Sequence, residues 1–181
     1  MRIFACLTIL SLFAACQSSP DLPNRATDAA VLMTADFEQS MGWGDANPAS
    51  LTTDKAHSGK WSARVKPDVT YGYTYSRPLG DLNATPLSHM MLEGWVLREA
   101  SGSTAKLVVQ VTTSVTDETN VFYTALPVAS VVPKFGEWTA VKVPINLPTS
   151  ATGTNRIKVY LWNDQSTATT YLDDVRLSKA E

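Results

Sequence analysis

From Val31 to the end of the chain, short runs of alternating apolar and polar residues are separated by residues typical of turns. In the run 156–162, Ile157, Val159 and Leu161 alternate with Lys158 and Tyr160. Because successive side chains of a β-strand point to opposite faces of a sheet, this alternation predicts strands, and no window shows the 3.6-residue period of a helix. The predicted strands cover residues 31–38, 60–67, 69–77, 88–98, 105–115, 120–127, 137–145, 155–163 and 169–178. The chain is therefore expected to be all-β, a sandwich or a barrel.

The charge balance and the length limit the class of partner and the number of domains that we expect. Lys and Arg number 15 against 17 Asp and Glu, a formal net charge of −2. Nucleic-acid binding depends on a strongly basic face, so this balance does not favour such a partner. A chain of 181 residues fits one domain better than two.

The first residues have the pattern of an export signal. Arg2 precedes an apolar run, residues 3–15, that is too short to span a bilayer but has the size of the hydrophobic part of a signal peptide. The run ends in LFAAC at residues 12–16 and turns abruptly polar. This ending resembles the lipobox of bacterial lipoproteins, in which the peptide is cut just before a lipid-modified Cys. An ordinary secretory signal, with Cys16 incidental, is the alternative.

The lipobox resemblance implies three segments. Residues 1–15 form the signal peptide, residues 16–30 form a tether whose acylated Cys16 inserts into the lipid bilayer, and residues 31–181 form the domain. It places the protein in the bacterial cell envelope, and no Asp follows Cys16 as an inner-membrane retention signal, which favours the outer membrane. The domain then has no Cys and cannot form a disulfide. The tether could instead be an ordered extension lying on the domain.

Three motifs at the two ends of the domain occur in a recognisable order. They are ADFE at residues 35–38, followed by Trp43; AHSGK at residues 56–60, before a strand that contains Ser62; and YLDDV at residues 171–175. Together they resemble the jelly-roll carbohydrate-binding modules of families 4, 9 and 22 and the wider galactose-binding-like group. The resemblance covers residues 31–178. It implies a jelly-roll β-sandwich of two antiparallel sheets and a glycan or polysaccharide as partner.

The same resemblance implies a structural calcium ion where the first and last strands meet. Its ligands would be oxygens of Glu38, Asp36, Lys55, Ser58, Asp173 and Asp174, and Ca²⁺ takes about six to eight such oxygens. Because strand side chains alternate, we expect Asp173 and Asp174 to face opposite ways, so that one of them binds the metal. The alternative is that these acids cap turns or lie in solvent. His57 is expected to be a turn residue.

Two sets of residues are candidates for ligand binding. Tyr71, Tyr73 and Tyr75 stand at alternate positions of a predicted strand and would share one face, with Arg77 on the same side. Pyranose rings stack on aromatic faces, and a phenol adds a hydrogen-bonding tip. Tyrosines in such a row could equally pack in the core or cover the edge of a sheet.

The second set is Tyr160, Trp162 and Asn163, which we expect to face away from the core if Ile157, Val159 and Leu161 face into it. Trp95 and Trp138 are expected to pack structurally.

No catalytic motif accompanies these residues. The chain has 2 His and lacks a Gly-x-Ser-x-Gly elbow or a P-loop, so no catalytic residue is predicted. The sequence thus favours a non-catalytic, membrane-anchored, carbohydrate-binding-like module. An adhesion, assembly or structural module with a protein partner is the alternative, and a small polysaccharide lyase or glycoside hydrolase is a further one.

Overall fold

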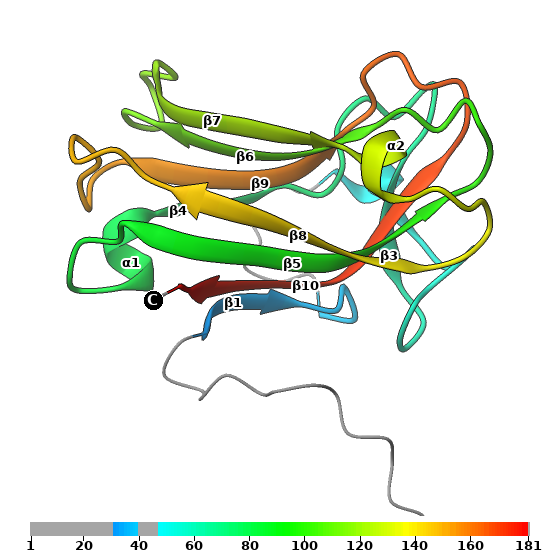
Figure 1. Ribbon diagram of the computed structural model, residues 1–181, viewed down its shortest axis with the longest axis horizontal. Coiled ribbons are helices and arrows are strands. Elements are labelled where there is room, and N and C mark those ends of the chain that lie inside the picture. Colours follow the sequence, from blue (N-terminus) through cyan, green and yellow to red (C-terminus); the bar gives the residue numbers. More distant parts are fainter. Residues whose placement is uncertain (1–30, 40–46, 181) are drawn as a thin grey trace, which may run out of the picture.

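The computed structural model describes residues 31–39 and 47–180, which fold into two antiparallel sheets packed face to face (Figure 1). The elements are β1 (Val31–Ala35), the 3-10 turn η2 (Pro48–Ser50), β2 (Leu51–Thr52), β3 (Ser62–Val65), β4 (Tyr75–Pro78), α1 (Leu79–Leu82), β5 (His89–Arg98), β6 (Lys106–Thr112), β7 (Asn120–Pro127), α2 (Val128–Val131), β8 (Thr139–Asn146), β9 (Arg156–Trp162) and β10 (Thr170–Lys179). The predictions for the signal peptide, the tether and Cys16 lie outside the described residues, as does Trp43.

One sheet brings the two ends of the domain together. Its strand order is β2-β3-β10-β5-β8, and β1 also pairs with β10. The first part of β10 pairs with β3, the later part pairs with β1, and β5 runs along the other side of β10. The expectation that the first and last strands lie side by side is therefore confirmed, and it places the motifs at residues 35–38 and 171–175 in one region.

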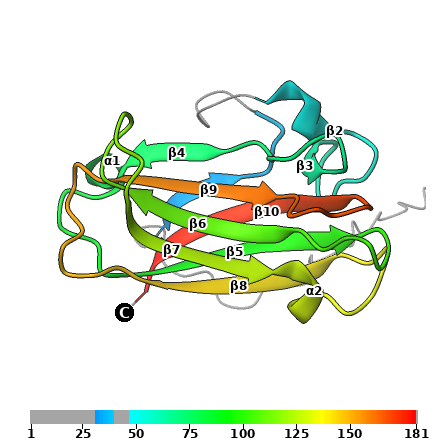
Figure 2. The ribbon, with the colours of Figure 1, turned by 90° about the horizontal axis from the view of Figure 1, so that it is seen from above.

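The other sheet is four-stranded, with the order β4-β9-β6-β7 and antiparallel pairing throughout (Figure 2). Figure 2 shows these strands as a layer lying over the strands of the first sheet. This arrangement of two antiparallel sheets is the jelly-roll sandwich that the family resemblance implied.

The core lies between the two sheets and is built from the alternating apolar residues. On β9, Ile157, Val159 and Leu161 are at most 1% exposed, as the period-two pattern predicts. They pack with the inner residues of β6 and with Leu92, Leu172 and others of the facing sheet. Because the inner faces of β6 and β9 fill the core, the other faces of these strands are free to form a surface.

The predicted strands differ from the observed ones mainly in one place. The prediction 69–77 is too long at its start, since β4 begins at Tyr75 and residues 72–74 are not strand. The two-residue strand β2 and the helices α1 and α2 were not predicted. The helices have four residues each, which is too short for a 3.6-residue period to appear in the sequence.

Candidate functional site

The outer face of the four-stranded sheet carries polar and aromatic side chains. Lys158, Tyr160 and Trp162 alternate with the buried residues of β9, so they stand on the opposite face. On β6, Gln110 lies directly opposite Lys158. Tyr71 forms an isolated bridge with Trp162 and thereby extends this face beyond the start of β4.

A cavity of about 520 Å³ opens on this face. The rings of Tyr71 and Tyr160 meet edge to face within it, with centroids 5.9 Å apart and an interplanar angle of 73°. The Tyr160 hydroxyl donates to Gln110 Oε1 at 3.3 Å, and Asn47 Nδ2 donates to the Tyr71 carbonyl at 3.0 Å. The full lining consists of Asn47, Tyr71, Gly72, Thr74, Gln110, Glu118, Lys158 and Tyr160. We call this surface the cleft.

The protonation state of the tyrosine at its centre follows from its surroundings. Burial raises the pKa of Tyr160 to about 12, and the nearby Tyr123, Tyr71 and Glu118 act in the same direction. An ordinary tyrosine is already protonated at neutral pH, and the raised pKa keeps this phenol protonated and able to donate a hydrogen bond well above it. Tyr71, which is 51% exposed, offers ring surface to a ligand.

The prediction that Tyr71, Tyr73 and Tyr75 share one face is wrong. Tyr71 pairs with Trp162 but Tyr75 pairs with Val159, so four residues on one strand span three on the other. One extra residue between two paired positions has the effect of a β-bulge, because it turns the following side chains to the other face. Tyr73 and Tyr75 are consequently 6% and 5% exposed and belong to the core.

Two further residues of the predicted ligand site, Arg77 and Asn163, also lie apart from the cavity lining. Arg77 pairs with Ile157, a core residue of β9, and so stands on the other face of the sheet from Lys158. Asn163 is 6% exposed; its backbone N–H donates to the Thr70 carbonyl and its Nδ2 to the Ser166 carbonyl. Of the predicted ligand residues, the cavity is lined by Tyr71 and Tyr160, and Trp162 stands on the same face of β9.

At the opposite sheet, two aspartates hold one turn. Asp173 Oδ2 accepts from the N–H groups of His57 and Ser58 at 2.7 and 3.3 Å. Asp174 Oδ2 lies 2.6 Å from His57 Nδ1, and its Oδ1 accepts from the Ser58 hydroxyl at 2.7 Å. The His57 ring stacks on Trp95 with centroids 3.9 Å apart and meets Trp138 edge-on, so this turn is anchored by packing as well.

The expectation that Asp173 and Asp174 face opposite ways is wrong for a definite reason. The register between β10 and β5 shifts between Asp173 and Arg176, and Asp174 has a positive φ of 46°. An extra residue with left-handed backbone is a β-bulge, which breaks the alternation of side chains. Both carboxylates therefore reach the same turn. We call Asp173, Asp174, His57 and Ser58 together the aspartate clamp.

The other acids of the predicted metal site hold backbone groups nearby. Glu38 Oε1 accepts from the N–H groups of Lys60 and Trp61, both at 2.6 Å, and Asp36 Oδ1 accepts from the Glu38 N–H at 3.1 Å. The Lys55 carbonyl accepts from the Ser62 hydroxyl at 2.6 Å.

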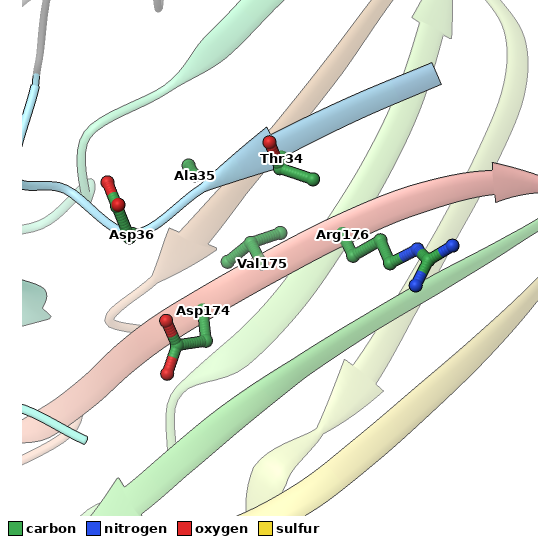
Figure 3. A pocket seen from close by; sticks show the side chains of 6 residues that line it. All are labelled: Thr34, Ala35, Asp36, Asp174, Val175 and Arg176. Carbon is green, nitrogen blue, oxygen red and sulfur yellow. The ribbon is translucent and has the colours of Figure 1, made fainter. Parts of the chain in front are cut away.

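A hollow of about 220 Å³ between β1 and β10 is lined by Thr34, Ala35, Asp36, Asp174, Val175 and Arg176. Figure 3 shows the carboxylates of Asp36 and Asp174 near one end of this hollow and the Arg176 side chain at the other.

Comparison with solved structures places this architecture among known folds. One match is the CBM22-2 xylan-binding domain of Xyn10C from Paenibacillus barcinonensis, with 18% identity, a TM-score of 0.55, and coverage of 82% of this chain and 99% of that one. The tandem CBM22-1–CBM22-2 domain of the same Xyn10C matches with 19% identity, a TM-score of 0.58, and coverage of 91% and 52%. The CBM22-1–GH10 modules of Xyn10B from Clostridium thermocellum, complexed with xylohexaose, match with 17% identity, a TM-score of 0.52, and coverage of 84% and 29%.

This chain has the fold of the jelly-roll carbohydrate-binding modules. No protein-family model matches its sequence, and no curated protein does. The chain spans about half of the tandem module structure and less than a third of the xylanase fragment.

Sequence reasoning missed several residues that line the cleft of this jelly-roll module. Lys158 and Gln110 occupy polar positions of strands 156–162 and 106–112, so the alternation that selected Tyr160 also contained the signal for them. Glu118 lies in the loop before β7, and Asn47 precedes η2; neither has a local pattern that marks it. Their places in the cleft follow from the packing of distant segments.

The residues of the predicted calcium site are Glu38, Asp36, Lys55, Ser58, Asp173 and Asp174. Within residues 31–39 and 47–180, no three His, Cys, Asp or Glu side chains gather as a metal-binding group. Both oxygens of Asp173, and both of Asp174, already accept hydrogen bonds or contact His57. Calcium therefore stays a prediction of the resemblance, and nothing below depends on it. Within the same residues, no helix is long and apolar enough to cross a bilayer.

Proposed function

We propose that the protein is a non-catalytic module that binds a glycan in the cleft on the outer face of the β4-β9-β6-β7 sheet. The observation that carries this proposal is the cavity itself, in which the rings of Tyr71 and Tyr160 stand beside the amide of Gln110. Aromatic surface takes up the apolar faces of sugar rings, and phenol and amide groups bond their hydroxyls. The cavity volume of about 520 Å³ falls within the range of ordinary ligand sites.

The comparisons add support through the chemistry of the matched modules. One of them is described as a xylan-binding domain, and another was determined with xylohexaose. A β-linked oligosaccharide of that kind is accordingly the first ligand to test.

The charges of the cleft favour binding over hydrolysis. A glycosidase needs two carboxyl groups flanking the scissile bond. Among the residues that line the cavity, Glu118 supplies a carboxylate, and it is paired with Lys158 at 2.5 Å. A reducing-end assay on the glycans that bind should therefore remain flat.

Xylohexaose and a panel of neutral polysaccharides test the binding by calorimetry and affinity electrophoresis. Tyr71→Ala and Trp162→Ala should each weaken binding at least about tenfold, because each removes ring surface from the same face. Trp61→Ala is the matched control: Trp61 is 37% exposed but precedes β3 in the other sheet, so binding should be unchanged. Equal losses of glycan affinity in all three variants, or no binding of the wild type to any glycan, would contradict the proposal.

We also propose that the mature protein is lipid-anchored in the bacterial envelope through Cys16. The support is the LFAAC ending of the apolar run at residues 12–16. Cys16→Ser should abolish incorporation of radiolabelled palmitate and release the module from the membrane fraction. Labelling that persists in this variant would refute the anchor while leaving the glycan proposal intact.

A further inference from the structure

Two lysines of the outer sheet face are each held by a loop carboxylate. Lys158 Nζ on β9 lies 2.5 Å from Glu118 Oε1, in the loop between β6 and β7. Lys106 Nζ on β6 lies 2.7 Å from Asp164 Oδ2, in the loop after β9, and 5.1 Å from the centroid of the Trp162 ring. Positive charge on this face is thus compensated from the surrounding loops.

The partners of the first pair are unequally exposed. The Lys158 side chain is 18% exposed and that of Glu118 is 65% exposed. Lys158 is therefore fixed in the floor of the cleft, whereas Glu118 reaches down to it from the solvent side. Since both residues line the cavity, a bound ligand would meet this pair directly.

A third cation stands further along β9 on the same face. Arg156 donates from Nη1 to the Ser76 hydroxyl at 3.0 Å. It does not line the cavity, and among the described residues it forms no ion pair. Arg156 is two residues from Lys158, which is about 7 Å along a strand. It is therefore the natural control for a charge effect that belongs to the cavity itself.

We propose that Glu118 determines the charge specificity of the cleft. By neutralising Lys158, it removes the positive charge that would otherwise favour a glycan bearing carboxylate groups. A uronic-acid carboxylate entering the wild-type cleft would have to displace Glu118 from Lys158. This displacement exchanges one ion pair for another, so the acidic ligand gains no binding free energy from its charge. A neutral glycan leaves the pair in place. This inference rests on the proposed function, because it concerns the ligand of the same cleft.

The test compares xylohexaose with a xylooligosaccharide of the same length that carries one glucuronic acid, by calorimetry at 20 mM and 500 mM NaCl. Wild type should bind the acidic ligand no more tightly than the neutral one. Glu118→Gln should shift the preference toward the acidic ligand by about threefold to fivefold at low salt, the upper part of the range of an exposed ion pair. The shift should vanish at high salt, where exposed charges are screened.

Three further variants locate the effect. Lys158→Gln introduced into Glu118→Gln should abolish the gain in preference for the acidic ligand, because it removes the lysine charge that Glu118 no longer neutralises. Arg156→Gln in the same background should leave the gain in place. Glu137→Gln alone breaks a comparable exposed pair, Glu137 with Lys134, away from the cleft, and should change neither affinity.

The possible results separate the two proposals. If wild type already prefers the acidic ligand, or if Glu118→Gln binds xylohexaose but leaves the ratio unchanged, the inference is overturned alone. If neither ligand binds wild type or any variant while all remain folded by thermal melting, the proposed function is overturned, and this inference with it.

Discussion

The sharpest consequence of the bulge between Tyr71 and Tyr75 is that neighbouring tyrosines should respond in opposite ways to truncation. Tyr71 is 51% exposed on the cleft, and Tyr73 is 6% exposed in the core. Burying an aromatic side chain of about 200 Å² stabilises a protein by about 5 kcal/mol, at about 25 cal/mol per Å². In proportion to the buried fractions, Tyr73→Ala should cost about 4–5 kcal/mol of unfolding free energy, and Tyr71→Ala at most about 2.5 kcal/mol.

Binding should show the reverse order. In urea unfolding followed by tryptophan fluorescence, Tyr73→Ala should have the lower midpoint with an unchanged slope. In calorimetry with xylohexaose, Tyr71→Ala should be the variant that loses affinity, provided that Tyr73→Ala is assayed where it is fully folded. If Tyr71→Ala were the more destabilised variant, or if Tyr73→Ala lost binding while keeping wild-type stability, the bulge and the orientation derived from it would be refuted.

Three other predictions concern the aspartate clamp, a glycine turn and the tyrosine in the cleft. Burial raises the pKa of Asp173 to about 6 from 3.8. The folded state thus holds this proton more tightly, and the group's stabilising contribution, present below about pH 4, is lost as the pH rises through about 6. The unfolding free energy of wild type minus that of Asp173→Asn, measured in EDTA, should accordingly fall by up to about 3 kcal/mol from pH 4 to 7; a rise would contradict it. Gly59 and Gly136 both have positive φ. A Cβ added at Gly136 would meet nothing within 4 Å, whereas a Cβ added at Gly59 would lie 2.5 Å from Glu38 Oε1. Gly136→Ala should therefore cost about 1–2 kcal/mol and Gly59→Ala at least about 1 kcal/mol more, so equal thermal shifts would exclude the Glu38 contact. Because the pKa of Tyr160 is about 12, its phenolate absorbance should appear about two pH units above that of an ordinary tyrosine, and a Tyr160→Phe difference titration with its step near pH 10 would disprove this.

The sequence alone determined the β architecture and the two faces of β9. Alternation of side chains is a local property of a strand, so Ile157, Val159 and Leu161 could be assigned to the core and Tyr160 and Trp162 to the other face without knowledge of any partner strand. The resemblance of the motifs at the two ends of the domain to the jelly-roll modules likewise implied that the first and last strands meet, and β1 pairs with β10.

Only the tertiary structure decided which residues share a site. Two bulges, one between Tyr71 and Tyr75 and one after Asp173, reverse the alternation that the sequence suggested. A bulge arises from the register between paired strands, and a shift of one residue turns every later side chain to the other face. Glu118 joins Lys158 for a similar reason: the pair is 40 residues apart in the chain, and the packing of β6, β7 and β9 brings it together.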